Sequence, residues 1–161
     1  MPETVAARDY CGSFANVLTV YAFLAEIREA GHKGIIVTAG NSATGSIVAS
    51  LVKRLDIPAI FLIRTAAARE ALVRHGVRHV LITTHETFDV DVQSLAGELQ
   101  TTAVFDGVGG ELLSRILPAL PLNTVIYVYG FLGGATPITV PTMLLMGKNL
   151  TLRRFTPHYF A

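Results

Sequence analysis

Apolar residues in this chain gather into short continuous runs, and longer stretches of mixed polarity separate these runs. The runs are rich in Ile, Val, Leu and Phe, which is typical of strands that are buried on both faces of a parallel sheet. Between them, apolar residues recur at helical spacing, and Gly or Pro often follows the last of them. The pattern predicts strands at residues 35–38, 59–63, 80–82, 102–105, 124–128 and 150–152. It predicts helices at residues 17–30, 46–55, 66–75, 89–99, 111–117 and 141–147.

Strands and helices alternate along the whole chain in this reading. The alternation predicts an α/β fold, a doubly wound, parallel six-stranded Rossmann sheet with helices on both faces and right-handed crossovers. Residues 1–15 show no clear period and are expected to form a lead-in segment, and Asn16 is a suitable N-cap for the first helix. Ligands of such sheets bind at the carboxyl ends of the strands, where the strand order reverses.

The stretch GIIVTAGNSATG, residues 34–45, reads as a strand that runs into a tight turn, with a helix from Ser46. A helix N-terminus presents unpaired N–H groups and a positive dipole end, which suit a phosphate. The dinucleotide frame G-x-G-x-x-G is filled here by Gly40, Ser42 and Gly45, so the middle glycine is replaced. Alternatively, Ser42 and Thr44 merely satisfy the helix start. The candidate contacts are Gly40, Asn41, Ser42, Ala43, Thr44 and Gly45.

Two more glycine-bearing loops follow the fourth and fifth predicted strands. They read DGVGG at residues 106–110 and YGFLGG at residues 129–134. Because parallel strands share one carboxyl edge, these loops are expected beside the first turn, at the predicted ligand edge. The candidate contacts in these loops are Val108, Gly109, Gly130, Phe131, Leu132 and Gly133.

Arginine stands at the end of the second predicted strand. In this fold the residue about 20 positions after the glycine turn meets the adenosine ribose, where an acid selects NAD and an arginine accommodates the 2′-phosphate of NADP. Arg64 holds that position, and Arg69 offers a second arm for bidentate hydrogen bonding. Two solvated arginines are the alternative. Since arginine at a helix N-terminus opposes the dipole, a bound anion is favoured, and the sequence predicts NADPH over NADH.

Composition narrows the class of protein. The chain has 161 residues, a formal net charge of +1 and 51% hydrophobic residues, which gives one domain and no reason for a nucleic-acid or membrane partner. Residues 116–147 carry no charge, but Pro and Gly interrupt them, so no spanning helix is expected. The single cysteine, Cys11, fits a reducing, cytoplasmic location. No metal site is expected. Gly76 breaks the helix between His75 and His79, so the two histidines need not share a face, and Cys11 is the only cysteine.

With these motifs in place, residues 16–156 resemble the cofactor domain of the medium-chain dehydrogenase/reductase superfamily. The branch is the zinc-independent one, with the quinone oxidoreductases and 2-enoyl thioester reductases. The likeness is carried by the helix opening at 16–19, the turn at 37–45, VFDGVGG at 104–110 and YGFLGG at 129–134. The resemblance implies that Thr19 lies near the cofactor phosphates, that the two later loops lie along the nicotinamide, and that Phe155 falls at its carboxamide end.

The resemblance also implies a function. Residues 16–161 are expected to be the NADPH-binding domain of an oxidoreductase that transfers a hydride to a small-molecule substrate. That substrate would be an enoyl thioester, an enone or a quinone. The substrate domain of the family has no counterpart in this sequence, so the fragment alone is expected to be inactive, and no catalytic residue is named. A homodimer is expected from the same resemblance.

Two functions of other classes stay open. One is a non-catalytic nucleotide-binding or interaction module, which the altered glycine turn allows. The other is a Rossmann methyltransferase that uses S-adenosylmethionine. A methyltransferase would be expected to carry an acid after the second strand, and Arg64 stands there instead.

Overall fold

The computed structural model describes residues 13–156. Its strands are β1 (Ile35–Val37), β2 (Ala59–Ile63), β3 (His79–Ile82), β4 (Ala103–Asp106), β5 (Val125–Val128) and β6 (Thr151–Arg154). Its helices are α2 (Ser13–Glu29), α3 (Ala43–Arg54), α4 (Ala66–Arg74), α5 (Phe88–Glu98), α6 (Gly110–Ile116) and α7 (Thr142–Lys148), with a 3₁₀ turn η1 (Leu117–Ala119). The strands form one sheet in the order β3-β2-β1-β4-β5-β6, and every pair is parallel. The predicted fold class is confirmed.

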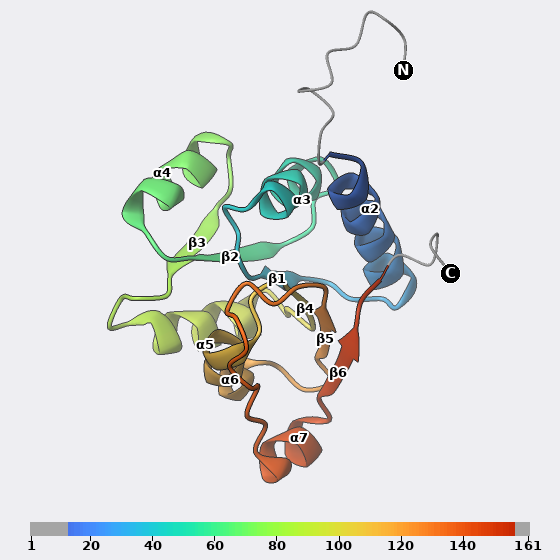
Figure 1. Ribbon diagram of the computed structural model, residues 1–161, viewed down its shortest axis with the longest axis vertical. Coiled ribbons are helices and arrows are strands. Elements are labelled where there is room, and N and C mark those ends of the chain that lie inside the picture. The colour runs from blue at the N-terminus through green and yellow to red at the C-terminus, as the bar shows by residue number, and fades with distance from the viewer. Residues whose placement is uncertain (1–12, 157–161) are drawn as a thin grey trace, which may run out of the picture.

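The residues of β1, β2 and β5 are all hydrophobic because helices cover both faces of the sheet. Figure 1 shows α2, α3 and α4 on one side and α5 and α6 on the other. Successive strand residues point to opposite faces. Ile35 and Val37 therefore pack in one core cluster and Ile36 in the other. No helix within residues 13–156 is long and apolar enough to cross a membrane.

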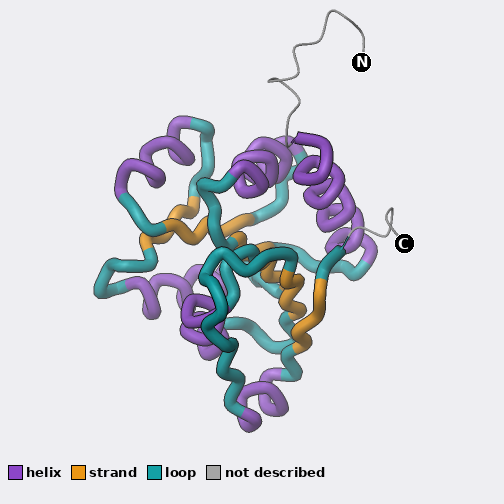
Figure 2. Tube along the Cα trace, in the orientation of Figure 1, coloured by secondary structure: helices purple, strands orange, loops and turns teal. Residues whose placement is uncertain are grey.

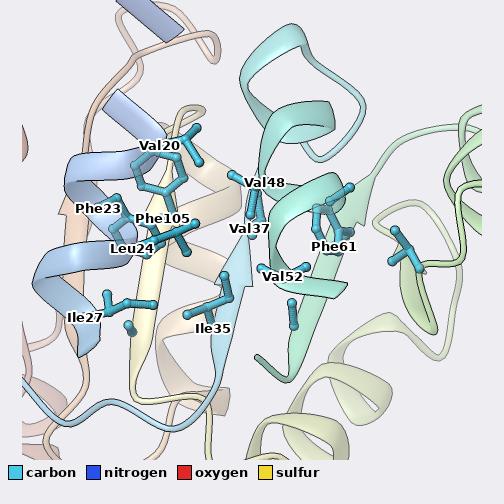
Figure 3. Packing of buried hydrophobic residues seen from close by; sticks show 14 of the residues in the cluster. Val20, Phe23, Leu24, Ile27, Ile35, Val37, Val48, Val52, Phe61 and Phe105 are labelled. Atoms are coloured by element: carbon cyan, nitrogen blue, oxygen red, sulfur yellow. The ribbon is translucent and has the colours of Figure 1, made fainter. Parts of the chain in front are cut away.

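The first core cluster centres on aromatic rings and on two helices that close over β1. Both helices lie on the same face of the sheet. Val20 and Ile27 of α2 lie on one flank of β1, and Val48 of α3 lies on its other flank (Figure 3). The ring of Phe23 stacks on that of Phe105 with centroids 4.1 Å apart. This packing holds α2 against the face of the sheet that β1 and β4 form.

The strand order reverses between β1 and β4. From β1 the chain continues through α3 to β2, and from β4 it continues through α6 to β5 on the other side. The carboxyl ends of β1 and β4 are therefore the place where the connections diverge and leave room for a ligand. A long loop joins β5 to α7, and Figure 2 shows it running from the sheet edge to that helix.

Two predicted helix starts are wrong. Helix α2 begins at Ser13, so residues 13–15 of the predicted lead-in segment are helical and Asn16 lies inside the helix instead of capping it. Helix α3 begins at Ala43, because the side chain of Ser42 caps it. The other elements agree closely with their predicted bounds. Cys11 lies outside the described residues.

Replacing Gly45 with alanine is expected to destabilise the fold by about 3 kcal/mol or more. A Cβ at this position would lie 2.3 Å from the Gly40 carbonyl oxygen, which is backbone and cannot yield cheaply. Gly97→Ala in α5 is the matched control. Nothing lies within 4 Å of its added Cβ, so its free energy of unfolding should rise by about 0.5–1 kcal/mol. Urea denaturation of both variants measures the difference, and equal effects would contradict the packing role of Gly45.

Candidate functional site

The turn after β1 is shaped by close backbone packing. Ala39 has a positive φ of 50°, and the Gly40 N–H then donates to the Leu62 carbonyl at 3.0 Å. A Cβ at Gly40 would lie 3.0 Å from the Cβ of Phe61, and one at Gly45 would strike the Gly40 carbonyl. The two glycines thus let the chain turn tightly against β2 and let α3 start directly over the turn. These are the first and third roles of glycine in the dinucleotide fingerprint.

Ser42 takes the middle position of that fingerprint and serves as the N-cap of α3. Its backbone is extended, with φ −72° and ψ 170°, and its Oγ accepts a hydrogen bond from the Gly45 N–H at 3.0 Å. The N–H groups of Ala43 and Thr44 have no partner within the helix. No described residue accepts from them either. The helix start therefore keeps two free donors beside a serine hydroxyl.

Thr44 joins the helix start to α2. Its side chain is buried and its hydroxyl donates to Oδ1 of Asn16 at 3.2 Å. Asn16 therefore supports the turn from the neighbouring helix, although it does not cap α2. Thr19 lies one turn further along α2 and donates to the Ala15 carbonyl at 2.7 Å.

A buried carboxylate fixes the loop after β4. Asp106 is fully buried and accepts from the Thr38 hydroxyl at 2.7 Å, from the Gly109 N–H at 2.9 Å and from the Val108 N–H at 3.2 Å. The Thr38 hydroxyl in turn accepts from the Gly107 N–H at 2.8 Å. Burial raises the pKa of Asp106, and its three hydrogen bonds oppose that rise. The result is a rigid link between the carboxyl ends of β1 and β4.

The loops after β4 and β5 lie side by side. The N–H of Leu132 donates to the Gly107 carbonyl at 2.9 Å, and that of Gly133 donates to the Val108 carbonyl at 2.8 Å. A Cβ at Gly133 would lie 2.8 Å from the same Val108 oxygen. The side chains of Phe131 and Leu132 are exposed. The structure thus brings together the two loops that the sequence singled out separately.

Tyr129, directly after β5, reaches across this edge of the sheet. Its ring stacks on Phe105 with centroids 4.1 Å apart, and its hydroxyl covers Gly107, where an added Cβ would lie 2.5 Å from the oxygen. Burial raises the pKa of Tyr129 to about 12, the Ser42 hydroxyl opposes the rise and Asp106 adds to it. Within residues 13–156 the buried hydroxyl has no hydrogen bond of ordinary geometry. The sequence analysis placed Tyr129 at the head of the loop motif 129–134 but did not count it among the candidate contacts.

The remaining candidates lie around this centre. Arg64 follows β2 at the same edge of the sheet, Arg69 lies in α4, and both side chains are exposed. No carboxylate of the described chain pairs with either of them. Phe155 is buried, and its ring packs edge-on against Phe23, Phe105 and Tyr127, so its side chain belongs to the core. Contacts of these residues with a cofactor stay predictions.

The arrangement suits a dinucleotide. A helix start with free N–H donors faces the place where the strand order reverses, and it can bind a phosphate. Two interlocked glycine loops form the neighbouring wall, and two arginines with no acidic partner among the described residues stand near the end of β2. The Tyr129 hydroxyl, which has no partner of ordinary geometry among residues 13–156, lies against Gly107 in this wall. The departure from the usual site is the Ser42 hydroxyl, which already holds one helix donor.

Comparison with known proteins gives similar structures but no matching sequence family. No model of a known protein family matches the chain, and no curated protein matches it. The fold is similar to that of a protein from Mesorhizobium loti assigned as an NADPH:quinone reductase. Sequence identity is 26%, the TM-score is 0.85, and the match covers 96% of this chain and 45% of that chain.

Two further structures support the likeness. One is a mitochondrial 2-enoyl thioester reductase heterodimer from Candida tropicalis, with 22% identity, a TM-score of 0.79, and coverage of 96% of this chain and 45% of that chain. The other is the Escherichia coli quinone oxidoreductase in complex with NADPH, with 20% identity, a TM-score of 0.79, and coverage of 97% and 48%. The predicted resemblance to this branch of the superfamily is confirmed at the level of the fold. The chain spans less than half the length of these proteins.

Thr38→Val is expected to lower the free energy of unfolding by about 2–4 kcal/mol. The valine has the same shape but leaves the Gly107 N–H without its acceptor, at about 1–3 kcal/mol, and removes the shorter of the two hydrogen bonds to Asp106 Oδ1, at about 1 kcal/mol. Thr38→Ser keeps the hydroxyl and should lose only about 1 kcal/mol for the buried methyl. Urea denaturation compares the two, and a larger loss in the serine variant would mean that Thr38 acts by packing alone.

The stability of the fold is expected to depend on pH through Asp106. Since its pKa in the fold is raised above its ordinary value of 3.8, the native state holds this proton more tightly than the unfolded state does. Its contribution is therefore fully present below pH 3.8 and is lost as the pH rises through the folded pKa. Urea denaturation of the wild type and Asp106→Asn from about pH 3 to 8 isolates the effect. The wild-type advantage should fall as pH rises, and an advantage that grows with pH would show a lowered pKa.

Proposed function

We propose that this chain is the NADPH-binding domain of a zinc-independent oxidoreductase. In the full-length protein it would serve hydride transfer to an activated carbon–carbon double bond or a quinone, with enoyl thioesters, enones and quinones as the substrate classes. The observation that carries this proposal is the meeting of the glycine turn and the two interlocked loops where the strand order reverses. The likeness to an assigned NADPH:quinone reductase over 96% of this chain supports it.

Each part of the site has a role in this proposal. The start of α3 would bind the pyrophosphate through the N–H groups of Ala43 and Thr44. The loops at Val108–Gly109 and Gly130–Gly133 would hold the nicotinamide ring in one orientation. The bound cofactor would supply the hydride, so the task of this chain is positioning. We assign the proton donor to no residue of this chain.

The choice of NADPH over NADH rests on Arg64 and Arg69. Both side chains are exposed near the carboxyl end of β2, and the described residues offer them no carboxylate partner. Two guanidinium groups in this place would bind a 2′-phosphate and would have nothing comparable to bind on the free ribose of NADH. An S-adenosylmethionine site is disfavoured for the same reason, because no acid follows β2.

A nucleotide-binding module without catalysis is the second candidate function. The observation in its favour is the Ser42 hydroxyl, which occupies one donor of the helix start that a phosphate would use. Such a module would bind NADPH without turnover in the full-length protein.

A homodimer and a cytoplasmic location remain predictions. β6 lies at one end of the sheet and offers an edge for a second copy.

Calorimetric titration at low salt is expected to show tighter binding of NADPH than of NADH. Arg64→Ala should weaken NADPH binding about ten-fold, or about 1.4 kcal/mol, and should leave NADH binding unchanged. Arg74→Ala is the matched control, because this exposed arginine lies in the last turn of α4, away from the predicted ribose position. Failure of the chain to bind either dinucleotide would contradict the proposed function. Equal loss in both arginine variants would contradict the phosphate clamp.

A further inference from the structure

A pocket of about 220 Å³ opens at the amino edge of the sheet, where the strands begin. It lies between two connections, the one from α3 to β2 and the one from α4 to β3. Because β2 and β3 are parallel neighbours, these two connections run side by side. The proposed dinucleotide site lies at the carboxyl edge, so the pocket is separate from it and can be occupied whether or not a cofactor binds.

The two helices beside the pocket end in the same way. After α3, Asp56 has a positive φ of 53°, and the Ile57 N–H donates to the Val52 carbonyl at 2.9 Å. After α4, Gly76 has a positive φ of 84°, and the Val77 N–H donates back into the last turn of the helix. Such bonds satisfy the last helix carbonyls and turn the chain sharply toward the next strand. The pocket lies between these two turns.

The floor of the pocket is apolar. Val52 of α3, Phe61 of β2 and Val77 of the link to β3 line it, and all three are buried in the first core cluster. Val52 and Phe61 are seen among the core side chains in Figure 3. The pocket is smaller than the roughly 300–1,000 Å³ that is usual for drug-sized ligands, so it suits a ligand of about one ring.

The rim of the pocket is charged. It carries Lys53, Arg78 and Asp56, and all three residues are exposed. The Lys53 side chain lies across Gly76, where an added Cβ would stand 2.7 Å from the lysine Nζ. Among residues 13–156 none of the three makes an ion pair or a side-chain hydrogen bond. Two positive charges and one negative charge leave the rim with a net positive charge that no described residue balances.

The helix dipoles account for only one of the two cations. Lys53 belongs to the last turn of α3, where a positive charge stabilises the C-terminal end of the helix. Arg78 lies beyond α4, in the link to β3, and has no carboxylate partner among the described residues. A single carboxylate would balance the rim, and its two oxygens match the fork of a guanidinium group. A phosphate dianion would exceed that balance.

We propose that this pocket binds a small organic carboxylate. The apolar body of the ligand packs on the floor, and its carboxylate meets Lys53 and Arg78 at the rim. Burial of the apolar body supplies most of the affinity, because ion pairs in contact with solvent contribute little. The charged rim selects an anion over a neutral molecule of the same shape. The chain thus has a second small-molecule site, at the opposite edge of the sheet from the predicted dinucleotide site.

Titration with benzoate, benzamide and acetate, followed by the amide signals in NMR spectra, tests both parts of the pocket. Benzoate should give saturable shifts at Val52, Ile57 and Val77. Benzamide lacks the charge and should bind about three-fold more weakly, and acetate lacks the ring and should bind more weakly still. Equal affinity for benzoate and benzamide would overturn the inference. So would the absence of saturation, or shifts confined to residues 40–45.

Variants of the two cations identify the rim. Lys53→Gln and Arg78→Gln should each weaken benzoate binding about two- to five-fold and leave benzamide binding unchanged. Arg154→Gln is the matched control, because this exposed arginine lies on β6, at the other end of the sheet from β3. Its benzoate affinity should equal that of the wild type. Equal loss in all three variants would mean that benzoate responds only to net charge, which overturns the inference.

Arg64→Ala separates the pocket from the dinucleotide site. This variant should bind benzoate like the wild type, because Arg64 lies at the carboxyl edge. Loss of benzoate binding in Arg64→Ala would place the anion at that edge and overturn the inference, while the proposed function would stand. Failure of the wild type to bind NADPH, with benzoate binding intact, would contradict the proposed function alone.

Stability gives an independent readout. Since benzoate binds the native pocket, saturating benzoate should raise the urea midpoint of the wild type. At one fixed benzoate concentration the rise should be smaller in Arg78→Gln than in Arg154→Gln. An unchanged wild-type midpoint, or equal rises in the two variants, would overturn the inference.

Discussion

The bond between Thr38 and Asp106 is the constraint on which the ligand edge of this fold depends. It joins the ends of β1 and β4, the two strands between which the order of the sheet reverses. Burying a carboxylate is unfavourable unless donors surround it, and here one hydroxyl and two backbone N–H groups do so. Those same N–H groups belong to the loop after β4. Compensation for the buried charge therefore also orders the loop.

The loop after β4 in turn holds the neighbouring segments in place. The carbonyls of Gly107 and Val108 accept hydrogen bonds from the loop after β5, and the face of Gly107 carries the phenol of Tyr129. The loops after β4 and β5 are thus linked through one glycine face. A side chain at Gly107 would push them apart.

In the turn after β1, the glycines allow close packing and the serine provides a hydrogen bond. Gly40 and Gly45 are required because backbone and β2 side chains lie where a Cβ would stand. Ser42 meets no such steric limit, and its hydroxyl satisfies a helix N–H instead. The three positions of the dinucleotide fingerprint therefore meet two different physical demands in this chain. One is room for close packing, and the other is an acceptor for a helix N–H. The demand for space is strictest at the third position, where a backbone oxygen lies 2.3 Å from an added Cβ, and weaker at the first, where the Phe61 side chain lies 3.0 Å away.

The sequence by itself determined the class of fold and the edge where the site lies. Parallel strands covered on both faces must be apolar throughout, and helices between them must repeat at helical spacing, so both signals are local. Arg64 could be placed at the end of β2 because its position depends on a count of about 20 residues along the chain from the glycine turn. The glycine loops could be grouped because parallel strands share one carboxyl edge.

The tertiary structure alone decided how the site residues are used. The sequence had offered Ser42 both as a phosphate contact and as a residue that satisfies the helix start, and in the fold its side chain caps α3, which begins at Ala43 over the packed turn. Phe155 entered the core because rings from α2, β4 and β5 surround it. The Tyr129 hydroxyl is shielded from solvent because it lies against Gly107, which belongs to the loop after β4. Contacts between distant segments depend on the packing of the whole sheet, which no local pattern encodes.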